Sequence, residues 1–249
     1  RQVCARMAEK VESKEENQIF LASKVVEMSM SGDRVVVSTA RGEYEARFVV
    51  NCAGLHSDRV TSLTETPKAK IIPFRGEYFE VVPEAHHLCR NLIYPVPDPS
   101  FPFLGVHFTR MIGGGLECGP NAVLAFAREG YTRTNVNWKD LAETLSYPGF
   151  LRLSAKYWRT GLGEMWRSFS KGAFVRALQR LVPEIEEHHL EAVPAGIRAQ
   201  AVTPEGKLVD DFLIQESSRV IHVGNAPSPA ATSSLNIGRL IVEKLEAHF

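Results

Sequence analysis

Residues 220–238 restrict the fold strongly. Their sequence, VIHVGNAPSPAATSSLNIG, contains an apolar strand that runs into Gly224, a turn with two prolines, and a helix that starts with small residues. Ser228 is suited to cap this helix and Pro229 to fill its first position, so we expect a helix over about 229–248. A strand that leads directly into a helix is the repeating unit of α/β layers, so the sequence predicts such a layer at this end of the chain.

The same segment could bind a ligand. Small side chains at 230–234 would let a flat molecule approach the backbone amides at the start of the helix, where the helix dipole is positive. The alternative is an ordinary capped helix packed tightly on a sheet, which also requires small residues. Both interpretations fit this segment equally well.

The order of the remaining patterns indicates an insertion. Val3, Met7 and Val11 predict an amphipathic first helix, and a β-meander from about 19 to 50 ends in a strand, 46–50, followed by a short helix after Gly54. Further strands are expected at 70–82, 104–109, 116–126, 192–201, 212–215 and 220–223, with several helices over 138–181. We therefore predict a mixed fold: an α/β layer made of 1–66 and 202–249, and an α+β region of antiparallel sheet with helices, 67–201, inserted into it.

Composition excludes several classes of function. The 29 basic and 29 acidic residues balance, which argues against a nucleic-acid partner, because phosphate binding requires excess positive charge. The four cysteines lack metal-like spacing, so we expect idle thiols. The acidic run at 184–187, followed by two histidines, is interpreted as a solvated helix end, and no metal site is predicted. No apolar run reaches the length of a membrane span.

Five polar residues of the inserted region could bind and convert a small anion. They are Arg75, Tyr78, His107, Arg110 and Arg198. Arg75, Glu77 and Phe79 should share one face of their strand, with Gly76, Tyr78 and Glu80 on the other. A guanidinium could hold a carboxylate with two hydrogen bonds, and a histidine could take a hydroxyl proton. A structural histidine and ordinary ion pairs are the alternatives for these residue types.

Several segments together resemble a known family. The segments are NCAGLHSDR, IIPFRGEYF, YPVPDPSFPFLGVHFTR, GPNAVLAFAREGY, PAGIRAQAV, KLVDDF and NAPSPAATSS. In this order they are similar to FAD-dependent oxidoreductases of the D-amino-acid-oxidase-like superfamily, most of all the L-2-hydroxyglutarate dehydrogenases and oxidases. Members of the family begin with a glycine fingerprint that binds the FAD pyrophosphate. The present sequence contains no GxGxxG in that context, so we expect a C-terminal part of such an enzyme, with an incomplete Rossmann-like layer.

The resemblance implies roles for individual residues. Val25, Ala53 and Gly54 would lie on the adenosine side of FAD. The residues implied at the flavin are Asn225, Ala226, Pro227, Ser228, Thr232, Ser233, Ser234 and Leu235. Substrate carboxylates would bind some of Arg75, Arg110 and Arg198, together with Tyr78. His107 would act as the catalytic base, with His56 as the alternative.

The resemblance also implies a reaction, the oxidation of L-2-hydroxyglutarate to 2-oxoglutarate with electrons passing from FAD to a quinone chain or to oxygen. The expected location is the cytoplasm, with peripheral association at the inner membrane, or the mitochondrion in a eukaryote. Two alternatives stay open. One is an amine or amino-acid oxidase on the same fold, and the other is an inactive, flavin-free fragment that acts only as a folded module.

Overall fold

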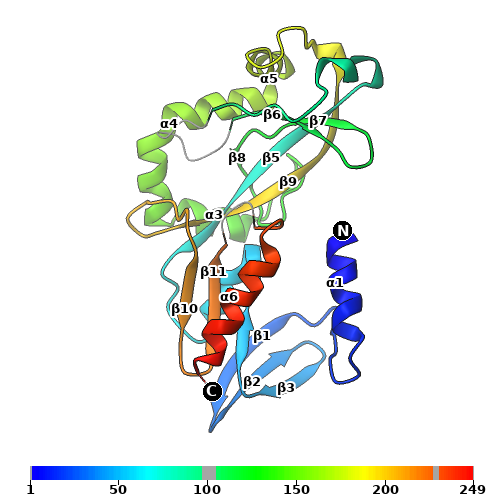
Figure 1. Ribbon diagram of the computed structural model, residues 1–249. Helices are drawn as coiled ribbons and strands as arrows, with labels where there is room; N and C mark the ends of the chain where they lie inside the picture. Colours follow the sequence, from blue (N-terminus) through cyan, green and yellow to red (C-terminus); the bar gives the residue numbers. More distant parts are fainter. Residues whose placement is uncertain (1, 97–104, 227–229, 249) are drawn as a thin grey trace.

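The computed structural model describes residues 2–96, 105–226 and 230–248 and contains three separate sheets (Figure 1). The first sheet is a meander of β1 (Val25–Ser31), β2 (Arg34–Thr39) and β3 (Gly42–Ala46). The second has the order β10 (Leu213–Glu216), β11 (Val220–Asn225), β4 (Val49–Asn51). Because β11 and β4 run parallel, the two ends of the chain form one layer, as the sequence predicted.

The third sheet is antiparallel and carries the insertion. Its strands are β5 (Lys70–Val81), β6 (His107–Arg110), β7 (Leu116–Gly119), β8 (Val123–Leu124) and β9 (Leu190–Val202). The long strands β5 and β9 pair over nearly their whole length, with one bulge in β9 between the partners of Gly76 and Tyr78. The predicted fold class is confirmed, whereas the domain limits at 66/67 and 201/202 stay a prediction.

The described part of the chain also contains six α-helices, the first of which buries no residue. They are α1 (Gln2–Glu12), α2 (Ser57–Thr61), α3 (Trp138–Leu145), α4 (Pro148–Phe169), α5 (Lys171–Leu178) and α6 (Ser234–Glu246), with single 3-10 turns η1 (Gly54–His56), η2 (Pro83–Leu88) and η3 (Glu187–His189). Non-helical backbone angles at Tyr157 bend α4, so that its two halves run in different directions (Figure 1). Among the described residues, no helix combines the length and the apolar character needed to cross a membrane.

Two boundaries differ from the sequence predictions. The expected single strand 46–50 is divided between β3 and β4, which belong to different sheets, so the chain changes sheet at Arg47 and Phe48. The last helix begins at Ser234 with Ser233 as its N-cap, because residues 230–233 form a turn. The predicted start at Pro229 is therefore wrong, and Ser228 itself lies outside the described residues.

The main apolar core lies between the sheet and α5. Phe79, Phe108 and Leu116 from the strands pack against Phe174 and Leu178 from the helix. The rings of Phe79 and Phe174 have centroids 4.7 Å apart. A second cluster joins Ile72 and Val202 to Tyr147 and Leu153 near the start of α4, which confirms the prediction that the helices of 138–181 pack on this sheet.

A buried ion pair connects the sheet to the parallel layer. Arg128 donates from both terminal nitrogens to the carboxylate of Asp58 on α2, and its Nη1 also donates to the Leu55 carbonyl at 2.6 Å. Asp58 Oδ2 in turn accepts the backbone N–H of Ile71 on β5 at 3.1 Å. Both charged side chains are almost completely buried. One carboxylate therefore joins α2, the first residues of β5 and the segment that follows β8.

Removing one partner of this ion pair should lower the free energy of unfolding. We expect Arg128→Met to lower the free energy of unfolding by about 3–5 kcal/mol, because Asp58 is left charged and uncompensated. The double variant Arg128→Met/Asp58→Asn should be less unstable than the sum of the two single changes. Urea titration of the four proteins checks this. Additive effects would show that the pair contributes no coupling.

His222 on β11 is fully buried and neutral. Its Nδ1 accepts from the Asn51 amide at 3.1 Å, so the ring proton is on Nε2, which donates to Thr64 Oγ1 at 2.9 Å. Burial lowers the pKa of His222, and the nearby Glu65 offsets only part of that shift. The unfolded chain therefore binds a proton at this site more readily than the folded chain does.

The consequence is a loss of stability in acid. Above the ordinary histidine pKa of about 6.5 the stabilisation is fully present, and it should decline as the pH falls below that value by up to about 1.4 kcal/mol per pH unit. His222→Gln should flatten this dependence between pH 7.5 and 5.5. Equal slopes for His222→Gln and the unchanged protein in urea titrations would contradict the assignment.

Candidate active site

Tyr78, Gly119 and His107 form a row across three adjacent strands. Gly119 on β7 pairs with His107 on β6, and Phe79 and Glu80 on β5 pair with Cys118 and Glu117, so the register continues to Tyr78 opposite Gly119. Paired residues of antiparallel strands point to the same face. Tyr78 and His107 therefore face the same way, with no side chain at the central position between them.

Gly119 makes room for the Tyr78 ring, and Gly196 borders the ring on the other side. Gly119 has φ +139°, and a Cβ at this position would lie 2.7 Å from the Glu77 carbonyl oxygen and 3.2 Å from Tyr78 Cδ1. On the other side, a Cβ on Gly196 of β9 would lie 3.8 Å from the same ring. Any larger residue at Gly119 would displace Tyr78 or the backbone of β5. These glycines were not singled out from the sequence, because their role depends on which strands become neighbours.

His107 is held in one tautomer. Its Nδ1 lies 3.2 Å from the Gly105 carbonyl, which can only accept, so Nδ1 carries the proton and the lone pair is on Nε2. Tyr94 stacks on the imidazole with ring centroids 4.3 Å apart and an angle of 19° between the planes. Burial lowers the pKa of His107, and the bond to Gly105 offsets only part of this shift. An uncharged imidazole with a free Nε2 is the form that a general base requires. Tyr94 was missed as a site residue, since no periodicity marks it.

Arg198 supplies positive charge beside Tyr78. It lies on β9 opposite Phe74, two residues from Gly196, and its side chain is exposed. The surrounding protein atoms lower the pKa of Arg198, and Tyr78 opposes that shift. Burial raises the pKa of Tyr78, as do Glu117 and Tyr94, whereas Arg198 lowers it. The hydroxyl thus stays a protonated donor near a guanidinium, a combination suited to an anionic ligand.

The two other predicted arginines point away from this face. Arg75 is buried and donates to Glu77 Oε1 at 3.3 Å and to the Thr132 carbonyl at 3.2 Å. Arg110 alternates with Thr109 along β6 and so shares the core side with Phe108, near Cys89. One terminal nitrogen of Arg110 is buried without a hydrogen-bond partner among the described residues. The structure therefore brings together Tyr78, His107 and Arg198, and places Arg75 and Arg110 on the other side of the strands.

The carboxylate of Glu77 keeps Arg75 on the buried side of β5. This carboxylate also accepts from Arg133 at 2.8 Å, from the Asn121 amide at 2.9 Å and from Ser168 at 2.8 Å. Burial alone raises the pKa of Glu77, but the hydrogen bonds from these three side chains outweigh it and hold the pKa below its usual range. Asn121 is itself buried in this network.

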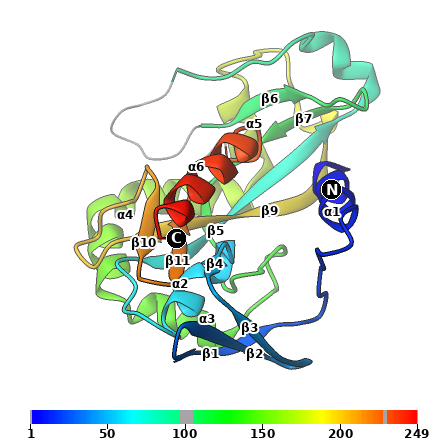
Figure 2. The same cartoon turned by 60° about the horizontal axis from the view of Figure 1, so that its bottom comes forward.

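A cavity of about 350 Å³ lies where α6 begins. Its walls come from the end of β4, from β5 and β9, and from β11 and α6, and they include Cys52, Gly54, Ile71, Ala199, Gly224, Asn225, Ala226, Ala230 and Ser234. Figure 2 shows α6 crossing β11 and β9 at this place. Two sequence segments that were expected to approach one ligand, 53–54 and 225–234, thus meet at one cavity.

The predicted cofactor residues divide into three groups. Gly54, Asn225, Ala226 and Ser234 line the cavity. Val25, at the start of β1, and Ala53, Thr232, Ser233 and Leu235 do not line it. Pro227 and Ser228 lie outside the described residues. The sequence did not reveal that the Asn225 amide donates to the carbonyls of Val209 and Asp211, at 3.1 and 2.7 Å, and so fixes the end of β11.

The cavity and the row both use β5. Ile71 and Ala199 line the cavity, and Tyr78 is seven residues beyond Ile71 along β5, roughly 23 Å at the usual strand rise. Because side chains alternate along a strand, Ile71 and Ala199 face the opposite side of the sheet from Tyr78 and Arg198. His56, the alternative base, lies with its Nε2 3.3 Å from Glu129 and takes no part in the row.

Comparison with known proteins gives consistent results. The family model "FAD dependent oxidoreductase" matches residues 1–244. The chain is 54% identical over 228 residues to the L-2-hydroxyglutarate dehydrogenase of Indibacter alkaliphilus, covering 91% of this chain and 57% of that protein. It is 46% identical to the Escherichia coli K12 protein of the same name, covering 99% of this chain and 58% of that protein. The mitochondrial protein of that name from Mus musculus is 44% identical, with coverages of 86% and 48%. The chain thus spans about half the length of these relatives.

Solved structures agree on the fold. The L-alpha-glycerophosphate oxidase of Mycoplasma pneumoniae with FAD bound matches with a TM-score of 0.64 at 17% identity, covering 90% of this chain and 50% of that one. A glycine oxidase from Geobacillus kaustophilus matches with a TM-score of 0.54 at 16% identity, with coverages of 93% and 50%. At these identities the likeness concerns the fold alone.

Proposed function

The chain belongs to the FAD dependent oxidoreductase family, and from this membership we propose that it forms the substrate-binding part of an enzyme that oxidises L-2-hydroxyglutarate to 2-oxoglutarate. Relatives that are 44–54% identical over most of the chain carry the name L-2-hydroxyglutarate dehydrogenase. The structural observation that carries the proposal is the row of Tyr78, Gly119 and His107 beside Arg198. It combines a neutral base, a hydroxyl donor and a cation on one sheet.

The residues at the cavity fit FAD, the cofactor of this family. Gly54 has φ +53°, and nothing in the protein lies within 4 Å of where its Cβ would be, so the backbone is open to a ligand here. Gly224, Ala226 and Ala230 add further short side chains to the wall. Residues around Gly54 and Asn225–Ser234 would hold the cofactor, and FAD, when bound, accepts the two electrons that the substrate loses.

The chain's own residues bind the substrate and move its proton. Arg198 would hold a carboxylate through two parallel hydrogen bonds, and Tyr78 would donate to a second oxygen. The substrate hydroxyl would then lie at His107 Nε2, which takes the proton as the carbon is oxidised. The bond from Nδ1 to Gly105 keeps Nε2 unprotonated and stabilises the positive charge that the ring gains.

The acceptor and the location complete the proposal. We place the final electron acceptor among membrane quinones or oxygen, and the protein on the periphery of a membrane. For a bacterial protein that membrane bounds the cytoplasm. The eukaryotic relatives are named as mitochondrial proteins.

Rates with different substrates test the reaction. The full-length protein, assayed with a soluble dye as electron acceptor, should oxidise L-2-hydroxyglutarate in preference to glycine, sarcosine and glycerol 3-phosphate. Preference for an amine would replace the proposal with an amine or amino-acid oxidase. Purification of the protein without the yellow absorbance of a flavin, together with no turnover, would instead favour a module that binds no cofactor.

Removing the base should depress turnover. We expect His107→Gln to lower kcat by roughly 10²–10⁴-fold while flavin content stays normal. In the unchanged enzyme kcat/KM should fall on the acid side, below the ordinary histidine pKa of about 6.5, because burial lowers the pKa of His107. This acid limb should vanish in the variant, and His56→Gln should behave like the unchanged enzyme. Near-normal turnover of His107→Gln would exclude the base role.

Changing the fork of Arg198 should weaken substrate binding. Arg198→Lys keeps the charge but loses the second hydrogen bond, so we expect KM to rise by about tenfold or more. Arg110→Lys is the matched control, because Arg110 faces the core side, and its KM should stay within about twofold. Equal KM values for Arg198→Lys and the unchanged enzyme would remove Arg198 from the substrate site.

A further inference from the structure

All three tryptophans of the chain are exposed. Trp138 on α3 is 77% exposed, and Trp158 and Trp166 on α4 are 55% and 63% exposed. Tryptophan is on average a highly buried residue, so its exposure at every position in one protein calls for an explanation. The proposed reaction uses none of the three.

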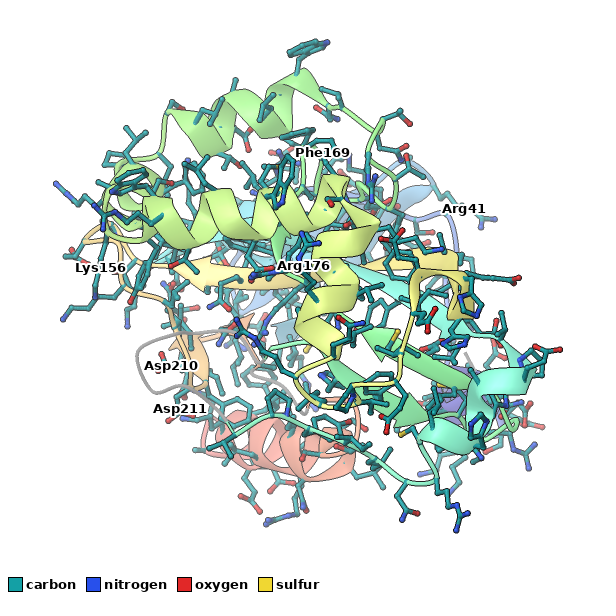
Figure 3. The ribbon with its side chains drawn as sticks, turned by 90° about the horizontal axis from the view of Figure 1, so that it is seen from above. Arg41, Lys156, Phe169, Arg176, Asp210 and Asp211 are labelled. Carbon is teal, nitrogen blue, oxygen red and sulfur yellow. The ribbon has the colours of Figure 1, made fainter. Side chains whose placement is uncertain are left out.

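Four exposed apolar residues form a stripe on the C-terminal half of α4. Trp158, Leu162, Trp166 and Phe169 follow one another at intervals of four, four and three residues, and each is more than half exposed. At the geometry of an α-helix these positions fall within an arc of roughly 80°. We call this set the α4 stripe. In Figure 3 this half of α4 runs across the outside of the sheet, with Lys156 near one end and Phe169 near the other.

The stripe lies in a strongly basic segment of a neutral chain. Between Pro148 and Arg180 there are seven lysines and arginines and one acidic residue, a net charge of +6, whereas the whole chain has 29 charges of each sign. The single acid, Glu164, is buried and paired with Arg167. The Arg159 guanidinium lies 5.2 Å from the Trp158 ring centroid, so positive charge directly borders the stripe.

The apolar surface continues into the molecule. A cavity of about 390 Å³ opens between α4 and the sheet, and Trp158 and Leu162 belong to both its wall and the stripe. Phe74, Leu124 and Phe150 form much of the remaining wall. An apolar group that binds next to the α4 stripe could therefore also contact the apolar wall of this cavity.

We propose that the α4 stripe and its basic neighbours bind the surface of a lipid bilayer that contains anionic headgroups. Tryptophan rings prefer the boundary between headgroups and acyl chains, apolar side chains enter that boundary, and Lys and Arg attract negatively charged lipids. This inference rests on the peripheral membrane association proposed above and assigns it to one surface. It would deliver electrons close to a lipid-soluble acceptor.

The charge also argues against the other occupants of an apolar stripe. A second copy of the chain would bring two segments of net charge +6 face to face, which like-charge repulsion opposes. A small anion is also a poor fit, because an anion site needs several hydrogen-bond donors that converge on one point. Here the basic side chains border a row of apolar and aromatic side chains instead. A bilayer satisfies both the apolar and the basic parts of the surface at once.

Vesicle binding tests the proposal with the full-length protein. Sedimentation with vesicles of phosphatidylcholine and phosphatidylglycerol should bring the protein down, and tryptophan emission should shift to the blue. High salt and vesicles of phosphatidylcholine alone should weaken binding. Trp158→Ser/Trp166→Ser should lower the partition coefficient by roughly tenfold or more. Trp138→Ser, an equally exposed tryptophan on another helix, is the matched control and should bind normally.

Reversing the charge of two basic residues tests the electrostatic contribution to vesicle binding separately from that of the tryptophans. Lys156→Glu/Arg159→Glu should also lose roughly tenfold or more on anionic vesicles. Arg34→Glu, an exposed arginine in β2, should bind like the unchanged protein. Oxidation of L-2-hydroxyglutarate with a soluble dye should be the same in all these variants. The proposal is overturned if the unchanged protein stays in the supernatant, if Trp158→Ser/Trp166→Ser binds as well as Trp138→Ser, or if the tryptophan changes instead dissolve a dimer. Normal dye reduction in such a case would leave the proposed reaction standing.

Discussion

The bidentate contact between Arg128 and Asp58 determines how the sheet sits on the parallel layer. Asp58 belongs to α2, which follows β4, and it accepts from both Arg128 and the first residues of β5. The carboxylate and guanidinium are removed from water, so each is stable only with the other present. The cavity at α6 takes one wall from each layer, and its shape therefore depends on this contact.

A second constraint is the division of the sheet into two chemically different faces. One face of β5 presents Phe79 and Val81 to the core and Glu77 to a closed network of hydrogen bonds. The other face presents Tyr78, flanked by glycines, next to His107 and Arg198. The first face engages Glu77 within the protein, whereas the second presents Tyr78, Arg198 and an imidazole nitrogen that has no hydrogen-bond partner among the described residues. The reactive groups are thus held by a rigid strand whose reverse side is firmly packed.

The alternation along β5 made much of this arrangement predictable. Residues 71–81 follow a period of two, so the separation of Arg75 and Glu77 from Tyr78 could be read from the sequence alone. The sequence did not show which face of β5 the helices would cover, because α4 and α5 lie some 70 to 100 residues further along the chain. For the same reason Arg75 looked like a ligand-binding arginine, although Glu77 and Thr132 already engage it.

For the elements at the two ends of the chain, the layer was predictable but the start of the last helix was not. The sequence predicted that the two ends of the chain contribute to one α/β layer, and β4 and β11 pair in parallel there. The start of α6 was misjudged because residues 230–233 suit both a helix and a turn, and in the structure they form a turn. Tyr94 acquires its place against His107 only through tertiary packing, so nothing local in the sequence marks it.

The bulge in β9 has an evolutionary consequence. Gly196 pairs with Gly76 but Val193 pairs with Tyr78, so the strand contains one residue more than its partner in this stretch. The bulge absorbs that extra residue, so the side chains before and after it keep the faces set by their partners on β5. Loss of one residue from 194–195 would remove the bulge and leave both flanking pairs in place, which makes this short stretch the part of β9 where a change of length is tolerated best.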